Sequence, residues 1–189
     1  MTTTTTTPAV QELTGDYTLD PAHTRIGFVA RHAMVTKVRG SFGEFEGTAN
    51  LDFSDPTKSS AQLTIQVPSI STGNGQRDEH LRANDFFDAP TYPEITFVST
   101  AVEVKDEENF RLIGDLTIKG VTKSVGVDFE LTGTAKDPFG NTRVGFDGKA
   151  VINRTDWGVN FNAALETGGV LVSEKITLEF DVSAIRQPV

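Results

Sequence analysis

Three histidines are the residues of this sequence that could most readily hold a metal ion. His23, His32 and His80 show none of the short spacings, such as HExxH, that bring two ligands onto one helix face. A zinc site formed by all three is still conceivable, since ligands can come from distant parts of a chain. Each also has a more ordinary role: His23 in a turn, His32 as a hydrogen-bonded residue at a core or pocket rim, and His80 in solvent. We therefore expect no metal site.

Acid–base or nucleophilic catalysis is also poorly supported by the residue pattern. The carboxylates Asp106, Glu107 and Glu108 lie together, but a solvated hairpin tip explains them better than a catalytic pair does. The GxSxG motif of α/β-hydrolases and the glycine-rich phosphate-binding loops are absent. We therefore expect no catalytic residues and a protein that is not an enzyme.

The composition excludes several further classes of protein. The chain has 189 residues, 17 basic against 26 acidic, and a net charge of −9, which argues against a uniform nucleic-acid-binding face. With no cysteine, disulfide frameworks and cysteine-based metal sites are excluded, and no apolar run is long enough to span a membrane. The unusual number is 13 Phe, against 2 Tyr and 1 Trp. What these rings surround is the main question that the composition raises.

The first residues differ in character from the rest. Met1–Thr7 is largely threonine and ends at Pro8, so we expect residues 1–14 to be a disordered leader and residues 15–189 to form one domain. No basic segment followed by an apolar stretch is visible there, so a secretory signal is not indicated. The expected location is the cytoplasm.

Most of the chain shows the period-two alternation of half-buried β-strands. In Phe45–Phe53, apolar or small residues alternate with Glu46, Thr48, Asn50 and Asp52. Short turn-like segments separate the runs, which predicts antiparallel neighbours. About eight or nine strands fit, and we expect a mainly β fold, an antiparallel eight-stranded up-and-down barrel. The other predicted strands are Gly15–Leu19, Thr24–His32, Leu63–Val67, Ile95–Val104, Phe110–Ile118, Val125–Leu131, Val144–Ile152 and Ile176–Val182.

One segment, Gly75–Tyr92, interrupts this alternation. Its first half contains helix-forming residues, and Pro90 and Pro93 end the pattern. We expect a short helical insertion of one or two turns that lies across the barrel or its end.

The inward face combines large Phe residues with small ones such as Gly47, Gly114 and Gly148. One explanation is a packed core in which small residues fit against large ones, and composition alone favours it. The other is an open lumen for an elongated apolar ligand, which suits an interior with almost no polar groups. The alternation does not decide between them.

Residues 21–43 form a basic region in an otherwise acidic chain. They contain no Asp or Glu and carry Arg25, Arg31, Lys37 and Arg39. These cations could face an anionic lipid head group or a membrane surface. Protection of a sheet edge by outward Arg and Lys is an equally good explanation.

Four groups of residues follow one another in a distinctive order and spacing. They are Leu19–Thr24 with Ile26, Phe28 and His32; Val38–Phe45; Asp78–Asp88 followed by Tyr92–Phe97; and Gly114–Thr122 with Ile152–Gly158. These motifs resemble those of the YceI-like, polyisoprenoid-binding family, over the region from Tyr17 to about Ile185. The resemblance implies a lipocalin-like barrel around a long apolar channel, in proteins that carry or store prenyl quinones, prenyl pyrophosphates or other long-chain amphiphiles. It implies no catalytic activity, and homodimers are common in the family. Many relatives carry an export signal, and this sequence shows none.

The resemblance and the alternation together give a set of candidate ligand-binding residues. The residues that match the family and fall on the inward face are Phe28, His32, Phe45, Phe97, Leu116, Ile118 and Phe146. Alternation alone adds Ala30, Leu63, Ile65, Val127, Phe129, Ile152, Ile176, Leu178 and Phe180. In addition, Leu81, Phe86 and Phe87 of a lid-like segment should pack on the barrel, and an Arg154–Asp156 pair should fix a loop.

The leading hypothesis is therefore non-enzymatic binding, storage or transport of a polyisoprenoid or similar lipid. The expected occupant is a molecule such as a polyprenyl quinone or polyprenyl phosphate, with no other cofactor. The expected partners are a membrane, contacted transiently, and a second copy in a homodimer, but no nucleic acid. The alternative is a packed-core structural or protein-interaction barrel without a small-molecule ligand.

Overall fold

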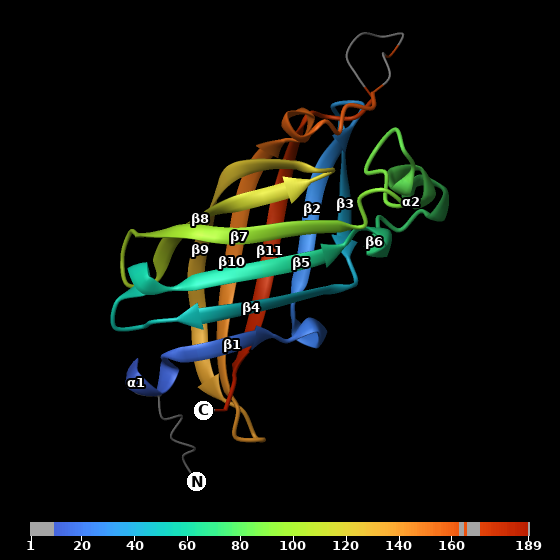
Figure 1. Ribbon diagram of the computed structural model, residues 1–189. Helices are drawn as coiled ribbons and strands as arrows, with labels where there is room; N and C mark the ends of the chain where they lie inside the picture. The colour runs from blue at the N-terminus through green and yellow to red at the C-terminus, as the bar shows by residue number, and fades with distance from the viewer. Residues whose placement is uncertain (1–9, 163–164, 166–170, 189) are drawn as a thin grey trace.

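A computed structural model describes residues 10–162, 165 and 171–188, and its strands form one antiparallel sheet (Figure 1). The strand order is β1-β4-β5-β7-β8-β9-β10-β11-β2-β3-β6, with β1 also paired to β11. The bounds are β1 Gly15–Leu19, β2 Arg25–His32, β3 Thr36–Phe42, β4 Phe45–Leu51, β5 Ser60–Gln66, β6 Ile70–Ser71, β7 Glu94–Val104, β8 Asn109–Ile118, β9 Val121–Lys136, β10 Thr142–Asn153 and β11 Lys175–Arg186. The helices are α1 Val10–Leu13 and α2 Gly75–Arg82, with short 3-10 turns at Pro21–His23, Pro56–Lys58, Val67–Ser69 and Arg154–Trp157.

The sheet closes on itself as the predicted eight-stranded barrel. β1 and β2 pair with the two ends of β11, and they pair with β4 and β3 respectively. Each pair, β1 with β2 and β3 with β4, is therefore one long strand bent at a short interruption, Asp20–Thr24 in the first case and Gly43–Glu44 in the second. In the same way β6 continues β5 after the short turn Val67–Ser69, since β5 pairs with β4 and β6 pairs with β3. Counting each of these three bent strands once gives eight strands, and Figure 1 shows β1, β4, β5 and β7 crossing in front of the long strands β10 and β11.

Neither β3 nor the two-residue β6 was predicted from the sequence, and β3 is the longer of the two. In β3, Val38 and Phe42 are the only apolar side chains that share a face, with Gly40 between them. The alternation is too weak to predict a strand, and β3 forms because its backbone pairs with β2 from Thr36 to Phe42. Tertiary pairing overrides weak local propensity here.

Part of the segment before Gly15 forms a short helix. Within the segment assigned to a disordered leader, Val10–Leu13 forms α1, and residues 1–9 lie outside the described residues. Leu13 is buried beside Tyr17, Val144 and Ala184, and the hydroxyl of Tyr17 donates a hydrogen bond to its carbonyl. Burial of one apolar side chain thus fixes this short turn against the barrel.

The predicted helical insertion is confirmed as α2 in the connection between β5 and β7. The side chain of Asn74 caps it by accepting from the N–H of Arg77. After it, Phe86 and Ala89 are buried, and Leu81 and Phe87 pack against the same cluster, as expected. Figure 1 shows α2 beside β6 and β3. We call this end of the barrel, which also holds the β2–β3 turn and the β10–β11 connection, the α2 end. The opposite end, with α1 and the β4–β5, β7–β8 and β9–β10 turns, is the α1 end.

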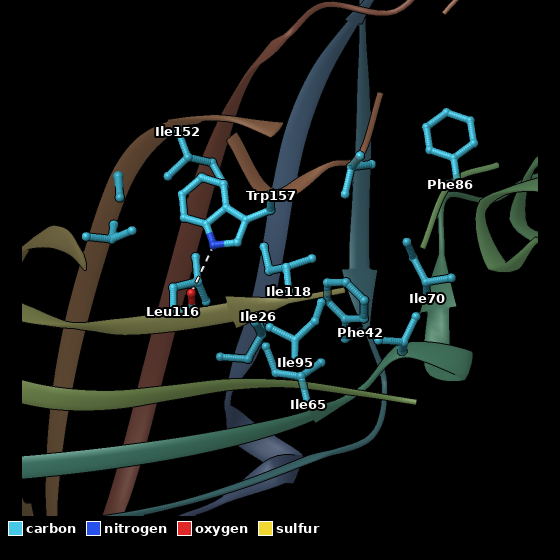
Figure 2. Close-up of a cluster of buried hydrophobic side chains, with 14 of the residues drawn as sticks. Ile26, Phe42, Ile65, Ile70, Phe86, Ile95, Leu116, Ile118, Ile152 and Trp157 are labelled. Carbon is cyan, nitrogen blue, oxygen red and sulfur yellow. Dashed lines mark hydrogen bonds between the residues drawn. The ribbon is translucent and has the colours of Figure 1, made fainter. Parts of the chain in front are cut away.

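Two buried clusters pack the ends of the barrel. The larger one lies toward the α2 end, where Trp157 donates a hydrogen bond from Nε1 to the carbonyl of Leu116 at 2.9 Å (Figure 2). The smaller one surrounds Tyr17 near the α1 end. No helix among the described residues has the length and apolarity needed to cross a membrane.

The expected Arg154–Asp156 pair is wrong. Arg154 is buried, and its guanidinium donates to the backbone carbonyls of Val159 at 2.6 Å, Ser173 at 2.9 Å and Val172 at 3.2 Å, while Asp156 is exposed. A single cation therefore ties the segment after β10 to the segment before β11.

Candidate functional site

The interior of the barrel is hollow. A cavity of about 590 Å³ extends through it, bounded by residues of every barrel strand. This volume falls in the range of cavities that hold small-molecule ligands in proteins. The wall is largely apolar, because the inward positions of the strands carry Leu, Ile, Val and Phe.

The structure brings almost all of the predicted site residues together in this wall. Phe45 is the exception: it packs against the larger buried cluster and does not line the cavity. It lies on the predicted inward face of β4, opposite Ile65 in the β4–β5 ladder, but its ring packs in the cluster and not against the cavity. The residues that line the cavity as predicted are Phe28, Ala30, His32, Leu63, Ile65, Phe97, Leu116, Ile118, Val127, Phe129, Phe146, Ile152, Ile176, Leu178 and Phe180.

The cavity explains where the phenylalanines of the sequence lie. Of the 13 Phe residues, only Phe45 and Phe139 are not part of the cavity wall. Toward the middle of the long strands, Phe129 stacks on Phe110 with ring centroids 5.6 Å apart and contacts Phe146 at 6.4 Å and Phe180 at 6.0 Å. These rings remain half-buried in the isolated chain, because one side of each faces open space in the barrel.

Glycines on the inward face let several of these rings lie against the wall. Phe129 stands directly opposite Gly148 in the β9–β10 ladder, and Phe28 stands opposite Gly40 in the β2–β3 ladder. A methyl group at Gly148 would lie 2.6 Å from Cδ1 of Phe129, and one at Gly40 would lie 2.8 Å from Cε1 of Phe28. Because such distances are impossible for real atoms, a side chain at either position would push the ring off the wall. The mixture of large and small inward residues therefore keeps the lumen open.

The two ends of the cavity differ in charge. At the α2 end its boundary includes the cationic side chains of Arg31, Arg77 and Arg154. At the α1 end it includes the carboxylates of Glu107 and Glu108. An amphiphile in the cavity would therefore meet cations near one end and anions near the other.

The structure places the three histidines in different roles. His23 Nδ1 lies 2.7 Å from a carboxylate oxygen of Asp20, and His80 Nε2 lies 2.7 Å from a carboxylate oxygen of Asp85. The ring of His80 also contacts Phe161 edge-on, and His32 is exposed at the cavity rim. Within the described residues, no three His, Asp or Glu side chains come together as a metal-binding group.

Part of the cavity boundary was missed by the sequence reasoning. Phe161, Leu171 and Val172 lie in the β10–β11 connection, where no periodic pattern exists to assign an inward face. Phe110 and Leu131, by contrast, sit on the predicted inward face of their strands, so the alternation alone could have identified them.

The strongest electrostatic cluster lies outside the cavity wall, near the α1 end. Arg143 donates to Asp20 at 2.7 Å and to Asp137 at 2.8 Å. The hydrogen bond from Arg143 lowers the pKa of Asp137 to about 2 and also lowers the pKa of Asp20, to which His23 contributes. The cluster joins the β9–β10 turn to the bend between β1 and β2, which gives it a structural role.

Comparison with protein families identifies the domain. The profile of the YceI-like domain matches residues 17–184, nearly the whole barrel. A UPF0312 protein of Staphylococcus aureus strain MSSA476 is 39% identical over 165 residues, which cover 87% of this chain and 94% of that protein. A UPF0312 protein of strain USA300 matches with the same identity and coverage.

Solved structures share the same barrel. BcnA of Burkholderia cenocepacia superposes with a TM-score of 0.77 at 27% identity, covering 87% of this chain and 98% of that one. The YceI protein of Campylobacter jejuni gives a TM-score of 0.74 at 31% identity, covering 84% and 90%. A polyisoprenoid binding domain from Saccharophagus degradans gives 0.66 at 16% identity, covering 90% and 98%, and at that identity it shows the fold alone.

Proposed function

This chain belongs to the YceI-like family, and on that basis we propose that it binds a polyisoprenoid or similar long-chain amphiphilic lipid without transforming it. The proposed role is storage or transport of a molecule such as a polyprenyl quinone or polyprenyl phosphate. A structural neighbour described as a polyisoprenoid binding domain supports this choice of ligand class.

The observation that carries the proposal is the apolar cavity inside the barrel. A filled interior would have favoured a structural protein, whereas here the inward Phe residues face open space. Each buried CH₂ group of a ligand contributes about 0.8 kcal/mol, so about fifteen such groups give about 12 kcal/mol before the costs of ordering and association. A prenyl chain can therefore bind here through its apolar surface alone.

The side chains of the long strands also favour an apolar ligand. Every residue that β8, β9, β10 and β11 contribute to the cavity wall is apolar. Recognition of a polar ligand needs convergent donors and acceptors. Polar contacts are therefore expected only at the two ends, with an anionic head group favoured at the α2 end by Arg31 and Arg77.

Two further properties are proposed from the sequence and the family resemblance. We propose a homodimer, which sedimentation equilibrium of the purified protein tests by its mass. We propose a cytoplasmic location, which fractionation of cells that express the native protein tests directly.

A pair of substitutions on neighbouring positions of β9 tests the proposed ligand site. Phe129 lines the cavity, whereas Asp128 is exposed and forms an ion pair with Lys105 at 2.9 Å. Phe129→Asp places a carboxylate against the ligand chain and should abolish the thermal stabilisation that added polyprenyl quinone produces in the unmodified protein. Asp128→Asn removes an exposed ion pair of small value and should leave that stabilisation unchanged.

The proposal fails if the ligand stabilises both variants equally, or if it stabilises neither the variants nor the unmodified protein. Circular dichroism of Phe129→Asp is needed as well, because loss of the fold would also abolish binding. If that variant does not fold, Phe129→Asn offers a neutral polar replacement at the same position.

A further inference from the structure

The β2–β3 turn at the α2 end exposes two apolar side chains. Met34 is 56% exposed and Val35 is 76% exposed, so neither packs on the barrel. The last pair of the β2–β3 ladder is His32 with Thr36, so residues 33–35 form a three-residue hairpin loop. Within it the N–H of Val35 donates to the carbonyl of His32 at 3.0 Å, and the side chains of Met34 and Val35 form the tip of the hairpin.

The backbone of this turn is strained. Ala33 and Met34 have φ angles of 51° and 61°, in the left-handed region that glycine and asparagine usually occupy in such turns. Neither side chain makes a local hydrogen bond that would offset this cost. The turn therefore retains large apolar residues at its tip against both conformational preference and exposure to water, which points to a contact made outside the chain.

Positive charge flanks the tip. Arg31 and Lys37 lie on either side of it, and neither has an ion-pair partner among the described residues. The guanidinium of Arg31 donates to the carbonyl of Val35 at 3.4 Å. Further along the hairpin, Arg39 and Arg25 lie 3.5 and 4.0 Å from Glu179, so their charges are partly matched.

Among the residues that the structure describes, the packing neighbours of the hairpin add one exposed carboxylate, Glu174. The segment 171–173 bonds to it through Ala33 N–H to the Leu171 carbonyl at 2.8 Å and Ser173 N–H to the Arg31 carbonyl at 3.0 Å. The next residue, Glu174, is an exposed carboxylate, and it follows this contact at the base of β11. An apolar tip with unpaired cations at its sides matches an anionic lipid surface, where apolar side chains enter the interface and cations approach the head groups.

We propose that the β2–β3 turn docks the protein on an anionic bilayer surface. Arg31 and His32 of the same hairpin border the cavity, so docking sets the α2 end of the cavity against the membrane. The docking surface depends on the hairpin alone, whereas its use for loading or unloading a lipid rests on the proposed function.

The opposite end of the barrel carries the competing surface. Phe139, at the tip of the β9–β10 turn, is 88% exposed. It lies beside Asp137, which Arg143 pairs at 2.8 Å, and the β7–β8 turn at the same end of the barrel carries Asp106, Glu107 and Glu108. An anionic bilayer repels the carboxylates of the β7–β8 turn. Phe139→Ser is therefore a matched control for removal of an exposed apolar side chain at a hairpin tip.

The experiment is co-sedimentation with vesicles of phosphatidylcholine, with and without phosphatidylglycerol. The unmodified protein should bind the anionic vesicles and leave the neutral ones, and salt should weaken the binding. Lys37→Glu should reduce the affinity for anionic vesicles by about twenty-five-fold. The substitution changes the charge by two units, and each unit changes the affinity by about fivefold near the surface. The double variant Met34→Ser, Val35→Ser should also lose binding, whereas Phe139→Ser should retain it.

Several results would overturn the proposal. Equal binding to both vesicle types, no binding to either, or loss of binding in Phe139→Ser with retention in the double variant would each contradict it. A double variant that leaves vesicle binding unchanged but shifts from dimer to monomer in size-exclusion chromatography would assign the tip to a second copy of the chain instead.

A second readout separates this inference from the proposed function. Lipid content after organic extraction and thermal stabilisation by polyprenyl quinone report on the cavity, and both should be unchanged in the hairpin variants. Vesicle binding without any lipid in the cavity would support the docking surface and contradict the proposed function. Lipid in the cavity without vesicle binding would support the proposed function and contradict the docking surface.

Discussion

Substitution of Gly148 by alanine should close part of the lumen. The new methyl group would lie 2.6 Å from Cδ1 and 2.8 Å from Cζ of Phe129, whereas carbon atoms in contact sit about 3.5–4.0 Å apart. The ring must therefore move by about 1 Å or more. Phe110, Phe146 and Phe180 surround it within the wall, so the free direction is into the cavity.

The two consequences of this movement differ in size. A ring displaced into the lumen excludes about two or three CH₂ groups of a bound chain, which amounts to about 2 kcal/mol, or about thirtyfold in affinity. Folding stability should change little. The crowding costs about 1 kcal/mol, and the lower entropy of the unfolded chain with alanine offsets most of it.

Displacement of a fluorescent apolar probe by polyprenyl quinone measures the affinity, and urea unfolding measures the stability. Gly133→Ala is the control, because it lies on β9 opposite Gly145 in the same ladder and its methyl group would meet nothing within 4 Å. Equal affinities in the two variants would refute the role of the glycine. A loss of several kcal/mol of stability in Gly148→Ala would show instead that the lumen is packed.

Three other substitutions test the contacts that hold the barrel. Arg154→Met removes three hydrogen bonds to backbone carbonyls and should lower the free energy of unfolding, measured in urea, by about 3 kcal/mol. A loss below about 1 kcal/mol would contradict the role of Arg154 in joining the segments that flank β10 and β11. Trp157→Phe leaves the carbonyl of Leu116 unpaired and should cost about 1–2 kcal/mol in the same assay, whereas no change would mean that water replaces the indole. Asp137→Asn removes a carboxylate whose pKa Arg143 lowers to about 2. The unmodified protein should therefore be more stable than this variant above about pH 4, and the difference in stability should vanish as the pH falls toward 2. A difference that persists at pH 2 in urea titrations would contradict this.

The alternation of the sequence predicts which side of each strand faces the interior, and most of the cavity wall follows from it. The inward positions of Phe129 and Leu178, for example, follow from the alternation alone. Phe45 also lies on the inward face, opposite Ile65, but it packs in the larger buried cluster, and alternation cannot distinguish a cluster residue from a cavity residue. Phe161 could not be placed at all, because the connection that carries it has no period.

Whether the interior is open or filled could not be predicted from these patterns. That property depends on which inward residues become neighbours across strands, such as Phe129 with Gly148, and the registers are set by distant pairings. The exposure of Met34 at the hairpin tip could not be predicted from the sequence either. A run of apolar residues between two strands does not show whether the turn buries them or presents them to solvent.

Organic extraction of the purified protein, followed by mass spectrometry, tests the central claim most directly. A barrel that holds a lipid should release one class of long-chain molecule in an amount close to one per cavity, and Phe129→Asp should release much less than Asp128→Asn. An extract without such a molecule, from protein that polyprenyl quinone also fails to stabilise, would contradict the account.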